Sequence, residues 1–435
     1  MTMRAMDRQQ GRLELLDGLR FLAALSVVAF HFTARESPSW DGLAVPADLE
    51  WLGRWTVYGE LGVPLFFIIS GFVLLMTAWD RSVPSFIASR VGRLFPAYWV
   101  AVAFSMVLVL VLWPEQWPTL GRVITEPGAL LNLTMVQTAF GAPDIDGPYW
   151  TLWYELRFYF LVVLLMLVGI TRARVLAFAT LWPIVAAVAQ GSGSGLLTTV
   201  LMPEYACYFA GGMLLYLIRR DGHDLGTWLL VGLQCVIGVG ISVPRYQDLH
   251  AADLTWGRSS LLLGVGIVAC FGLVALVTLG PVAGRRFRGM GWLGALTYPL
   301  YLVHENLGWY VIHLLSDRTG PLAAVLLATV AALLAAVLVH HLVERPTAPR
   351  LRRVVTDMLL RGAAPAGTAQ PSQTTALGMS TEDRAHRTAL LPRVAHPVLP
   401  ASRPHRQPVG AASAEDHPTV HLRGRAPQPA DPVRG

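Results

Sequence analysis

Apolar runs of membrane-spanning length are the feature of this sequence that most constrains its fold. A helix needs about 20 mostly apolar residues to cross the hydrocarbon core of a bilayer. Ten such runs lie at residues 16–34, 60–79, 94–113, 149–169, 174–190, 204–218, 226–243, 257–280, 292–313 and 321–343. Hydrophobic residues make up 54% of the chain and charged residues 14%, as is typical of integral membrane proteins. The sequence therefore predicts an all-α, polytopic membrane helix bundle of about ten transmembrane helices.

The positions of the arginines predict how this bundle is oriented. All 34 basic residues of the chain are arginine. If the N-terminus lies in the cytoplasm, the segments on that side hold seventeen arginines and those on the other side hold six, as the positive-inside rule requires. Both termini are therefore expected in the cytoplasm. Because most of these arginines flank apolar runs, the net charge of +6 does not indicate nucleic-acid binding.

The chain divides into three expected parts. Residues 1–15 form a short basic lead, and residues 16–346 form the membrane domain, whose last helix Pro346 is expected to stop. Residues 347–435 are rich in proline and contain no Phe, Trp or Tyr. Because such a composition cannot bury enough apolar surface to fold, a disordered cytoplasmic tail is expected. The three cysteines lie inside apolar runs without metal-ligand spacing, and no metal is expected.

The first apolar run carries two polar groups on one face. Arg20 stands near its start, and His31 follows eleven residues later. At about 100° per residue the two positions return to within roughly 20° of the same face, about 16 Å apart along the helix. Ionisable groups inside a membrane are costly and therefore mark candidate functional sites. Taken alone, each residue also fits a structural role, as a snorkelling arginine or a buried histidine.

Further polar residues lie within or beside later runs. Arg90 and Arg93 share a helical face at the cytoplasmic end of the third run, which fits either a membrane anchor or a clamp for phosphate. Glu155 and Tyr159 share a face in the fourth run, where a carboxylate needs a partner or a function. The ninth run carries a polar face made of Tyr298, Tyr301, Glu305 and His304.

These motifs together resemble a known family, the multi-pass acyltransferase 3 proteins, which include O-antigen, peptidoglycan and macrolide O-acyltransferases of bacteria. The resemblance runs from about Leu16 to Pro346. The matching motifs are LDGLRFLAAL followed by His31, GVPLFFIISGF, the Arg90 and Arg93 pair, WTLWYELRFYF with Glu155, YPLYLVH, and a terminal ERP. The chain departs from the family pattern at Leu156, Arg157 and Val303.

The resemblance implies transfer of an acyl group, commonly acetyl, from cytoplasmic acyl-CoA to a hydroxyl group of an acceptor. We expect His31 to act as the general base, because a positioned imidazole can take the proton of an attacking hydroxyl near neutral pH. Glu155 is expected to orient the His31 ring or to bind the acceptor. The coenzyme phosphates are expected to bind Arg20, Arg90 and Arg93. The candidate substrate-binding residues are Tyr159, Tyr301 and His304.

The expected protein is thus an O-acyltransferase of the bacterial inner membrane that acts on a carbohydrate or a glycosylated small molecule. Acetyl-CoA is its expected donor substrate, and no permanently bound cofactor is expected. The same ten spans with buried charges would also suit a multi-pass transporter of a small polar solute. Paired halves with matching broken helices, the usual sign of a transport site, are not evident in the sequence.

Overall fold

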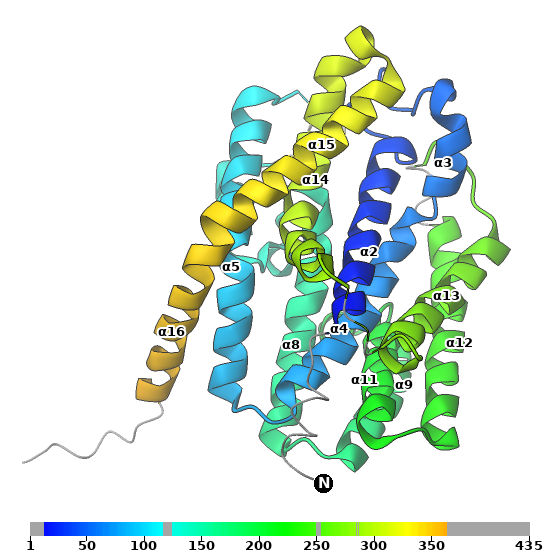
Figure 1. Cartoon of the computed structure of the whole chain (residues 1–435), viewed down its shortest axis with the longest axis vertical. Helices are drawn as coiled ribbons and strands as arrows, with labels where there is room; N and C mark the ends of the chain where they lie inside the picture. Colours follow the sequence, from blue (N-terminus) through cyan, green and yellow to red (C-terminus); the bar gives the residue numbers. More distant parts are fainter. Residues whose placement is uncertain (1–12, 116–123, 249–253, 284, 286, 363–435) are drawn as a thin grey trace, which may run out of the picture. The chain divides into compact units, whose positions relative to one another are not determined.

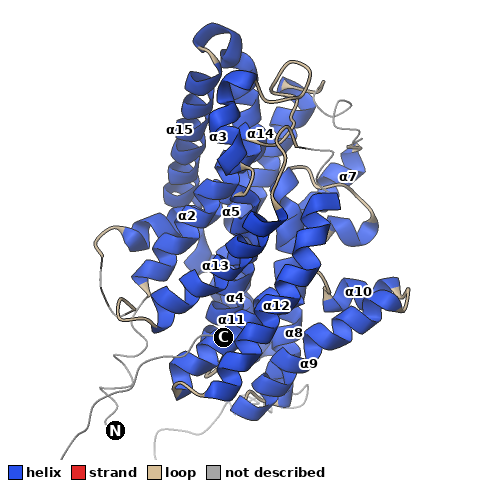
Figure 2. Ribbon diagram, turned by 90° about the vertical axis from the view of Figure 1, so that its right-hand side faces the viewer, coloured by secondary structure: helices blue, strands red, loops and turns tan. Residues whose placement is uncertain are grey.

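The computed structural model describes residues 13–115, 124–248, 254–283, 285 and 287–362. Within these ranges the chain is helical and forms no strand, apart from one isolated β-bridge between Arg35 and Leu254 (Figure 2). The predicted all-α class is therefore confirmed. The start of the predicted lead and most of the predicted tail lie outside the described residues.

The main helices follow one another along the chain (Figure 1). They are α2 (Glu14–Thr33), α4 (Gly62–Ala78), α5 (Val83–Val107), α8 (Trp150–Val168), α9 (Arg172–Gly191), α11 (Ala206–Asp221), α12 (Leu225–Asp248), α13 (Ser260–Leu279), α14 (Met290–Thr319), α15 (Pro321–Val339) and α16 (Arg345–Gly362). Short elements join them: η1 (Ala47–Leu49), α3 (Glu50–Thr56), η2 (Gly59–Leu61), α7 (Glu126–Leu131), η4 (Asn132–Thr134), η5 (Gln137–Phe140), η6 (Gly147–Tyr149) and α10 (Gly195–Leu201). Two π-helical turns, η3 (Leu108–Leu112) and η8 (His340–Glu344), extend α5 and α15.

The described chain contains nine helical segments that are long and apolar enough to cross a membrane. The one expected span that is not among these nine is the ninth run, at residues 292–313; it corresponds to α14, whose 30 residues include polar and aromatic side chains that lower its hydropathy. Large apolar side chains such as Leu167, Val188 and Leu261 are exposed on the helix surfaces, as contact with lipid requires. The chain is a multi-pass membrane protein.

Close contacts between α2 and α14 fix the relative position of these two helices. A methyl group added at Gly294 would lie 2.5 Å from Asp17 Cβ, and one added at Gly308 would lie 2.0 Å from Phe32 Cζ. The two contacts are 15 residues apart on α2 and 14 residues apart on α14, so the two helices run parallel and pack against each other along most of α2. We call the end of the bundle at which α2, α5 and α14 begin the basic end.

Two predicted boundaries are wrong. α5 begins at Val83, eleven residues before the predicted start, because Ser82 precedes it in an extended conformation and Pro84 suits the first turn of a helix. Arg90 and Arg93 therefore lie within α5. Pro346 does not end the last helix: the chain stays helical from α15 through a π-helical turn into α16, and the wider π-helical turn lies directly before Pro346, where the regular hydrogen-bond pattern is interrupted. The predicted tail is consequently helical up to Gly362.

The segment before α8 folds into the bundle. Tyr98 of α5 donates a hydrogen bond to the carbonyl oxygen of Asn132 at 2.6 Å. Asn306 of α14 donates to the carbonyl oxygen of Ile145 at 2.9 Å. The described part of this predicted loop therefore packs against α5 and α14, and it delivers η6 to the centre of α14.

Asp224 accepts hydrogen bonds that connect three helix ends at the basic end. It accepts hydrogen bonds from the Thr227 hydroxyl at 2.7 Å, from the Thr227 amide at 2.9 Å and from Arg172 at 2.7 Å. These hydrogen bonds, those from Thr227 first, lower the pKa of Asp224 to about 2. Arg172 also donates to Asp221 at 2.9 Å. The start of α9, the end of α11 and the start of α12 are thereby held at one point.

Candidate functional site

The His31 imidazole lies against a buried carboxylate of α14. His31 Nδ1 and Glu305 Oε2 are 3.0 Å apart, and both side chains are almost fully buried. Their separation is that of an ion pair, although the alignment is not that of a regular hydrogen bond. The parallel packing of α2 on α14 brings the two residues to the same level, between the contacts at Gly294 and Gly308. A carboxylate on Nδ1 favours the tautomer in which Nε2 is free to accept a proton.

Neighbouring side chains hold this pair in place. Arg35 Nη1 lies 3.6 Å from the second carboxylate oxygen of Glu305. Trp309, one turn beyond Glu305, donates its indole N–H to the carbonyl oxygen of His31 at 3.0 Å. The Arg35 guanidinium also lies over the Trp309 ring, 5.8 Å from its centre. The last turn of α2 is thus fixed to α14 on both sides of His31.

His304 of α14 lies next to the His31 ring. Its Nδ1 lies 2.9 Å from the carbonyl oxygen of Tyr301, and its ring centre lies 5.2 Å from that of His31. The ligand atoms of His31, His304 and Glu305 lie within 4.8 Å of one another, and two imidazoles with one carboxylate form a common zinc-binding set. Arg35 already supplies a positive charge to Glu305, which favours the ion-pair arrangement over metal coordination.

A glycine allows the segment before α8 to reach Glu305. A methyl group on Gly147 would lie 2.2 Å from Glu305 Oε1, so only glycine fits at this position without displacing the carboxylate. The preceding residue, Asp146, is fully buried and accepts a hydrogen bond from Ser105 at 3.2 Å. The position of Glu305 is therefore set by three elements: α2, α14 and η6.

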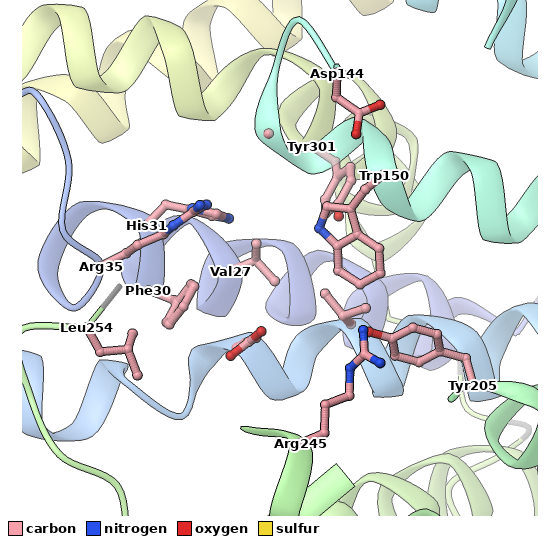
Figure 3. Close-up of a pocket in the computed structure, with 13 residues that line it drawn as sticks. Val27, Phe30, His31, Arg35, Asp144, Trp150, Tyr205, Arg245, Leu254 and Tyr301 are labelled. Atoms are coloured by element: carbon pink, nitrogen blue, oxygen red, sulfur yellow. The ribbon is translucent and has the colours of Figure 1, made fainter. Parts of the chain in front are cut away.

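His31 lines a cavity of about 330 Å³, which we call the histidine cavity. Its walls combine aromatic rings with charged groups. Figure 3 shows His31 and Arg35 on one side, with Trp150 and Tyr301 facing them and Tyr205 and Arg245 closing the far side. The carboxyl groups of Glu60 and Asp144 complete the polar lining. An imidazole beside aromatic and carboxylate groups can bind a small polar molecule and remove a proton from it.

The charged groups of this cavity are held by partners outside it. Glu60 Oε2 pairs with Arg258 Nη1 at 2.8 Å, and the Arg258 side chain is almost completely buried. Arg245 lies 3.7 Å from Glu204 and over the ring of Tyr205. Because the partners come from segments far apart in the sequence, the walls of the cavity are fixed by the tertiary structure.

A second, narrower cavity of about 50 Å³ lies on the basic side of the first, and we call it the arginine cavity. Arg20, Glu155, Ser70 and Tyr298 line it, and its lining shares Val63 and Tyr301 with the histidine cavity. Tyr301 therefore stands at the boundary between the two. Its hydroxyl lies 2.9 Å from that of Thr151, which also lines the arginine cavity.

Of the three arginines singled out in the sequence, Arg20 lines the arginine cavity, and Arg90 and Arg93 interact electrostatically with residues that line it. Electrostatic interactions link Arg20 to Arg93 and to Glu155. Arg90 interacts in the same way with Arg93 and Glu155. Tyr159 donates its hydroxyl to Glu155 at 2.6 Å. Arg20 of α2 and the Arg90 and Arg93 pair of α5 thus form one positively charged group, which shares Glu155 as a partner.

Comparison with known proteins identifies the family to which this arrangement belongs. The acyltransferase domain model of the acyltransferase 3 family matches residues 13–341. The chain belongs to the acyltransferase 3 family.

Curated relatives agree with this membership. The acyltransferase MdmB of Streptomyces mycarofaciens is 26% identical over 77% of this chain and 91% of its own length. The exopolysaccharide production protein ExoZ of Rhizobium meliloti is 26% identical over 72% of this chain and 97% of its own. The peptidoglycan O-acetyltransferase OatA of Listeria monocytogenes is 22% identical over 66% of this chain and 48% of its own. No solved structure matches the chain.

The structure corrects one expectation about this acyltransferase 3 chain. Glu155 does not orient the His31 ring, because it bonds to Tyr159 and lines the other cavity, while Glu305 lies against His31. The sequence pointed to Glu305 only as part of a polar face. An acid directly after His304 in an apolar run was the available signal, but the partner of that acid depends on helix packing.

Of the three expected substrate-binding residues, only Tyr301 lines a cavity described above. Tyr301 lines both cavities. His304 is fully buried and lines neither of them, and Tyr159 is also buried and lines neither. The positions of His304 and Tyr159 therefore suit support of His31 and of Glu155 better than contact with a substrate.

Proposed function

We propose that this acyltransferase transfers an acyl group, in the first instance acetyl, from acyl-CoA to a hydroxyl of a carbohydrate or glycosylated acceptor. The observation that carries the proposal is the pair of adjoining cavities that share Tyr301, one lined by Arg20 and the other by His31. One cavity suits a phosphate-bearing donor and the other a hydroxyl-bearing acceptor.

The donor would approach from the basic end. Guanidinium groups bind phosphate through charge-assisted, often bidentate hydrogen bonds. Arg20, Arg90 and Arg93 form a group of this kind. About 16 Å of helix rise separates Arg20 from His31, a distance that an extended pantetheine arm can span. The arm would pass Tyr301, where side chains must move to widen the narrow arginine cavity.

His31 would act as the general base. Its Nε2 takes the proton of the acceptor hydroxyl while the oxygen attacks the thioester carbonyl carbon. The tetrahedral intermediate then breaks its C–S bond, and the imidazolium returns the proton to the leaving thiolate. Glu305 holds the ring through Nδ1 and stabilises its charged form in the same way that a carboxylate does in hydrolase triads.

The histidine cavity would receive the acceptor. A sugar ring has apolar faces and a rim of hydroxyl groups. Trp150, Tyr205 and Tyr301 offer apolar surface, and Glu60 and Asp144 accept hydrogen bonds from hydroxyls. This combination supports a carbohydrate or a glycosylated small molecule as the acceptor.

The arginine distribution supports a cytoplasmic basic end and a bacterial inner membrane as the location. Coenzyme thioesters are cytoplasmic, so this orientation presents the arginine group to the donor. Family membership favours this enzyme over the transporter considered above. Solute flux through proteoliposomes that lack acyl-CoA would instead favour the transporter.

The test is donor turnover by the purified full chain in nanodiscs. Acetyl-CoA is supplied with candidate glycans, thiol release is measured, and the acceptor product is identified by mass spectrometry. The variant His31→Ala should fold and lose about 10² to 10⁴-fold in rate, the usual contribution of a general base. The control His313→Ala also removes a histidine, one of α14 that stacks on Trp113 away from both cavities. Normal product formation by His31→Ala would refute the base assignment.

A further inference from the structure

α16 packs tightly against the part of α5 that carries the paired arginines. A methyl group on Gly92, which lies between Arg90 and Arg93, would be 2.9 Å from both Ala348 O and Arg352 Cβ. The backbones of the two helices therefore touch at this point. Figure 1 shows α16, in orange, beside the first half of α5.

A cleft of about 630 Å³ opens beside this contact, and we call it the α5–α16 cleft. Its cationic lining comes from Arg93 of α5 and from Arg352 and Arg353 of α16, with the hydroxyl groups of Ser89 and Thr356 nearby. Two acids also line it, Glu344 and Asp357. Glu344 lies 2.7 Å from His340 Nδ1, and the three arginines outnumber the two acids.

Arg93 connects this cleft to the site inside the bundle. It lines the cleft and interacts electrostatically with Arg20, which lines the arginine cavity. Arg20 Nε is buried and has no hydrogen-bond partner. Like charges this close repel one another, and a buried guanidinium N–H without a partner is costly. An anion bound between the cleft and Arg20 would relieve both costs.

We propose that the α5–α16 cleft binds the 3′-phosphorylated adenosine end of coenzyme A, with Arg352 and Arg353 contacting the 3′-phosphate. This rests on the proposed function, in which acyl-CoA is the donor. Arg93 then meets the diphosphate, and Arg20 marks the point at which the pantetheine arm enters the bundle. In this arrangement the bound coenzyme would extend from the cleft past Arg93 and Arg20 to Tyr301 and His31.

The experiment compares two donors that differ only in the 3′-phosphate, acetyl-CoA and 3′-dephospho-acetyl-CoA. Arg352→Gln combined with Arg353→Gln should raise the KM for acetyl-CoA about tenfold or more, as loss of charge-assisted hydrogen bonds to a phosphate does. The KM for the dephosphorylated donor should change less than about twofold, because that donor makes no contact there. Arg350→Gln is the matched control, since Arg350 is an exposed arginine of α16 outside the cleft.

The other outcomes overturn the proposal in distinguishable ways. An equal rise in KM for both donors, or no change for either, would show that the cleft does not bind the 3′-phosphate. A defect seen only in nanodiscs containing phosphatidylglycerol, and equal for both donors, would assign the arginines to a lipid headgroup. If the wild-type chain neither turns over acetyl-CoA nor binds adenosine 3′,5′-diphosphate in calorimetry, the proposed function itself fails.

Discussion

His31 and Glu305 meet across the α2–α14 interface with 3.0 Å between Nδ1 and Oε2, and the carboxylate is almost completely buried. In the proposed mechanism this contact gives Glu305 the role of positioning His31. The Arg35 guanidinium lies 3.6 Å from the other carboxylate oxygen. The two residues lie 274 positions apart in the sequence, so their contact depends entirely on how the helices pack.

Replacing Glu305 by Gln should lower kcat while leaving the KM for acetyl-CoA nearly unchanged. An amide can present its N–H₂ to Nδ1, which favours the wrong tautomer, so a loss of about 10² to 10⁴-fold is expected. Glu155→Gln is the matched control in the other cavity and should act mainly on the KM for acetyl-CoA. Steady-state kinetics at saturating acceptor measure both. Equal kcat for Glu305→Gln and the wild type would remove Glu305 from the mechanism.

Replacing Gly147 by Ala should displace the Glu305 carboxylate. The added methyl group would lie 2.2 Å from Oε1, far inside contact distance, so either η6 or the carboxylate must move. We expect a fall in kcat comparable to that of Glu305→Gln, with no larger effect when both changes are combined, because they act on the same contact. Gly191→Ala, at an open position of α9, should behave as the wild type. Full additivity of the two changes would contradict the shared cause.

Replacing Gly308 by Ala should weaken the whole bundle and not only the site. The methyl group would lie 2.0 Å from Phe32 Cζ, and overpacking of this kind costs roughly 1–3 kcal/mol. Thermal unfolding in detergent should show a lower Tm, and adding Phe32→Leu should restore part of it. Gly272→Ala on α13 has open space and serves as the control. An unchanged Tm for Gly308→Ala would show that α2 and α14 can separate freely.

The contribution of Asp224 to stability should depend on pH. Its pKa is lowered to about 2 by the hydrogen bonds from Thr227 and Arg172, so the stabilisation is complete above the ordinary aspartate pKa of about 4 and is lost as pH falls through 2. Asp224→Asn should therefore reduce thermal stability at pH 6, and the difference from the wild type should shrink below pH 4. A difference that stays constant from pH 6 to pH 2.5 would contradict this origin.

Much of the fold follows from local pattern. The run at residues 149–169 became α8 (Trp150–Val168), and the run at 321–343 became α15 (Pro321–Val339) with its π-helical turn. Apolar length determines such helices because a backbone in lipid must bond to itself. The ends are less predictable, as α5 and α16 show, because capping residues and proline near a helix start override the apolar pattern.

The sequence by itself determined the helices, the face of α2 that carries Arg20 and His31, and the family. Only the tertiary structure decided that Glu305 and not Glu155 faces His31. It also decided that α16 and Arg93 of α5 line the same cleft. The reason is physical: helical periodicity specifies which side chains share a face of one helix, but the partner of that face is selected by close contacts between helices. Here those contacts are made at Gly294, Gly308 and Gly92.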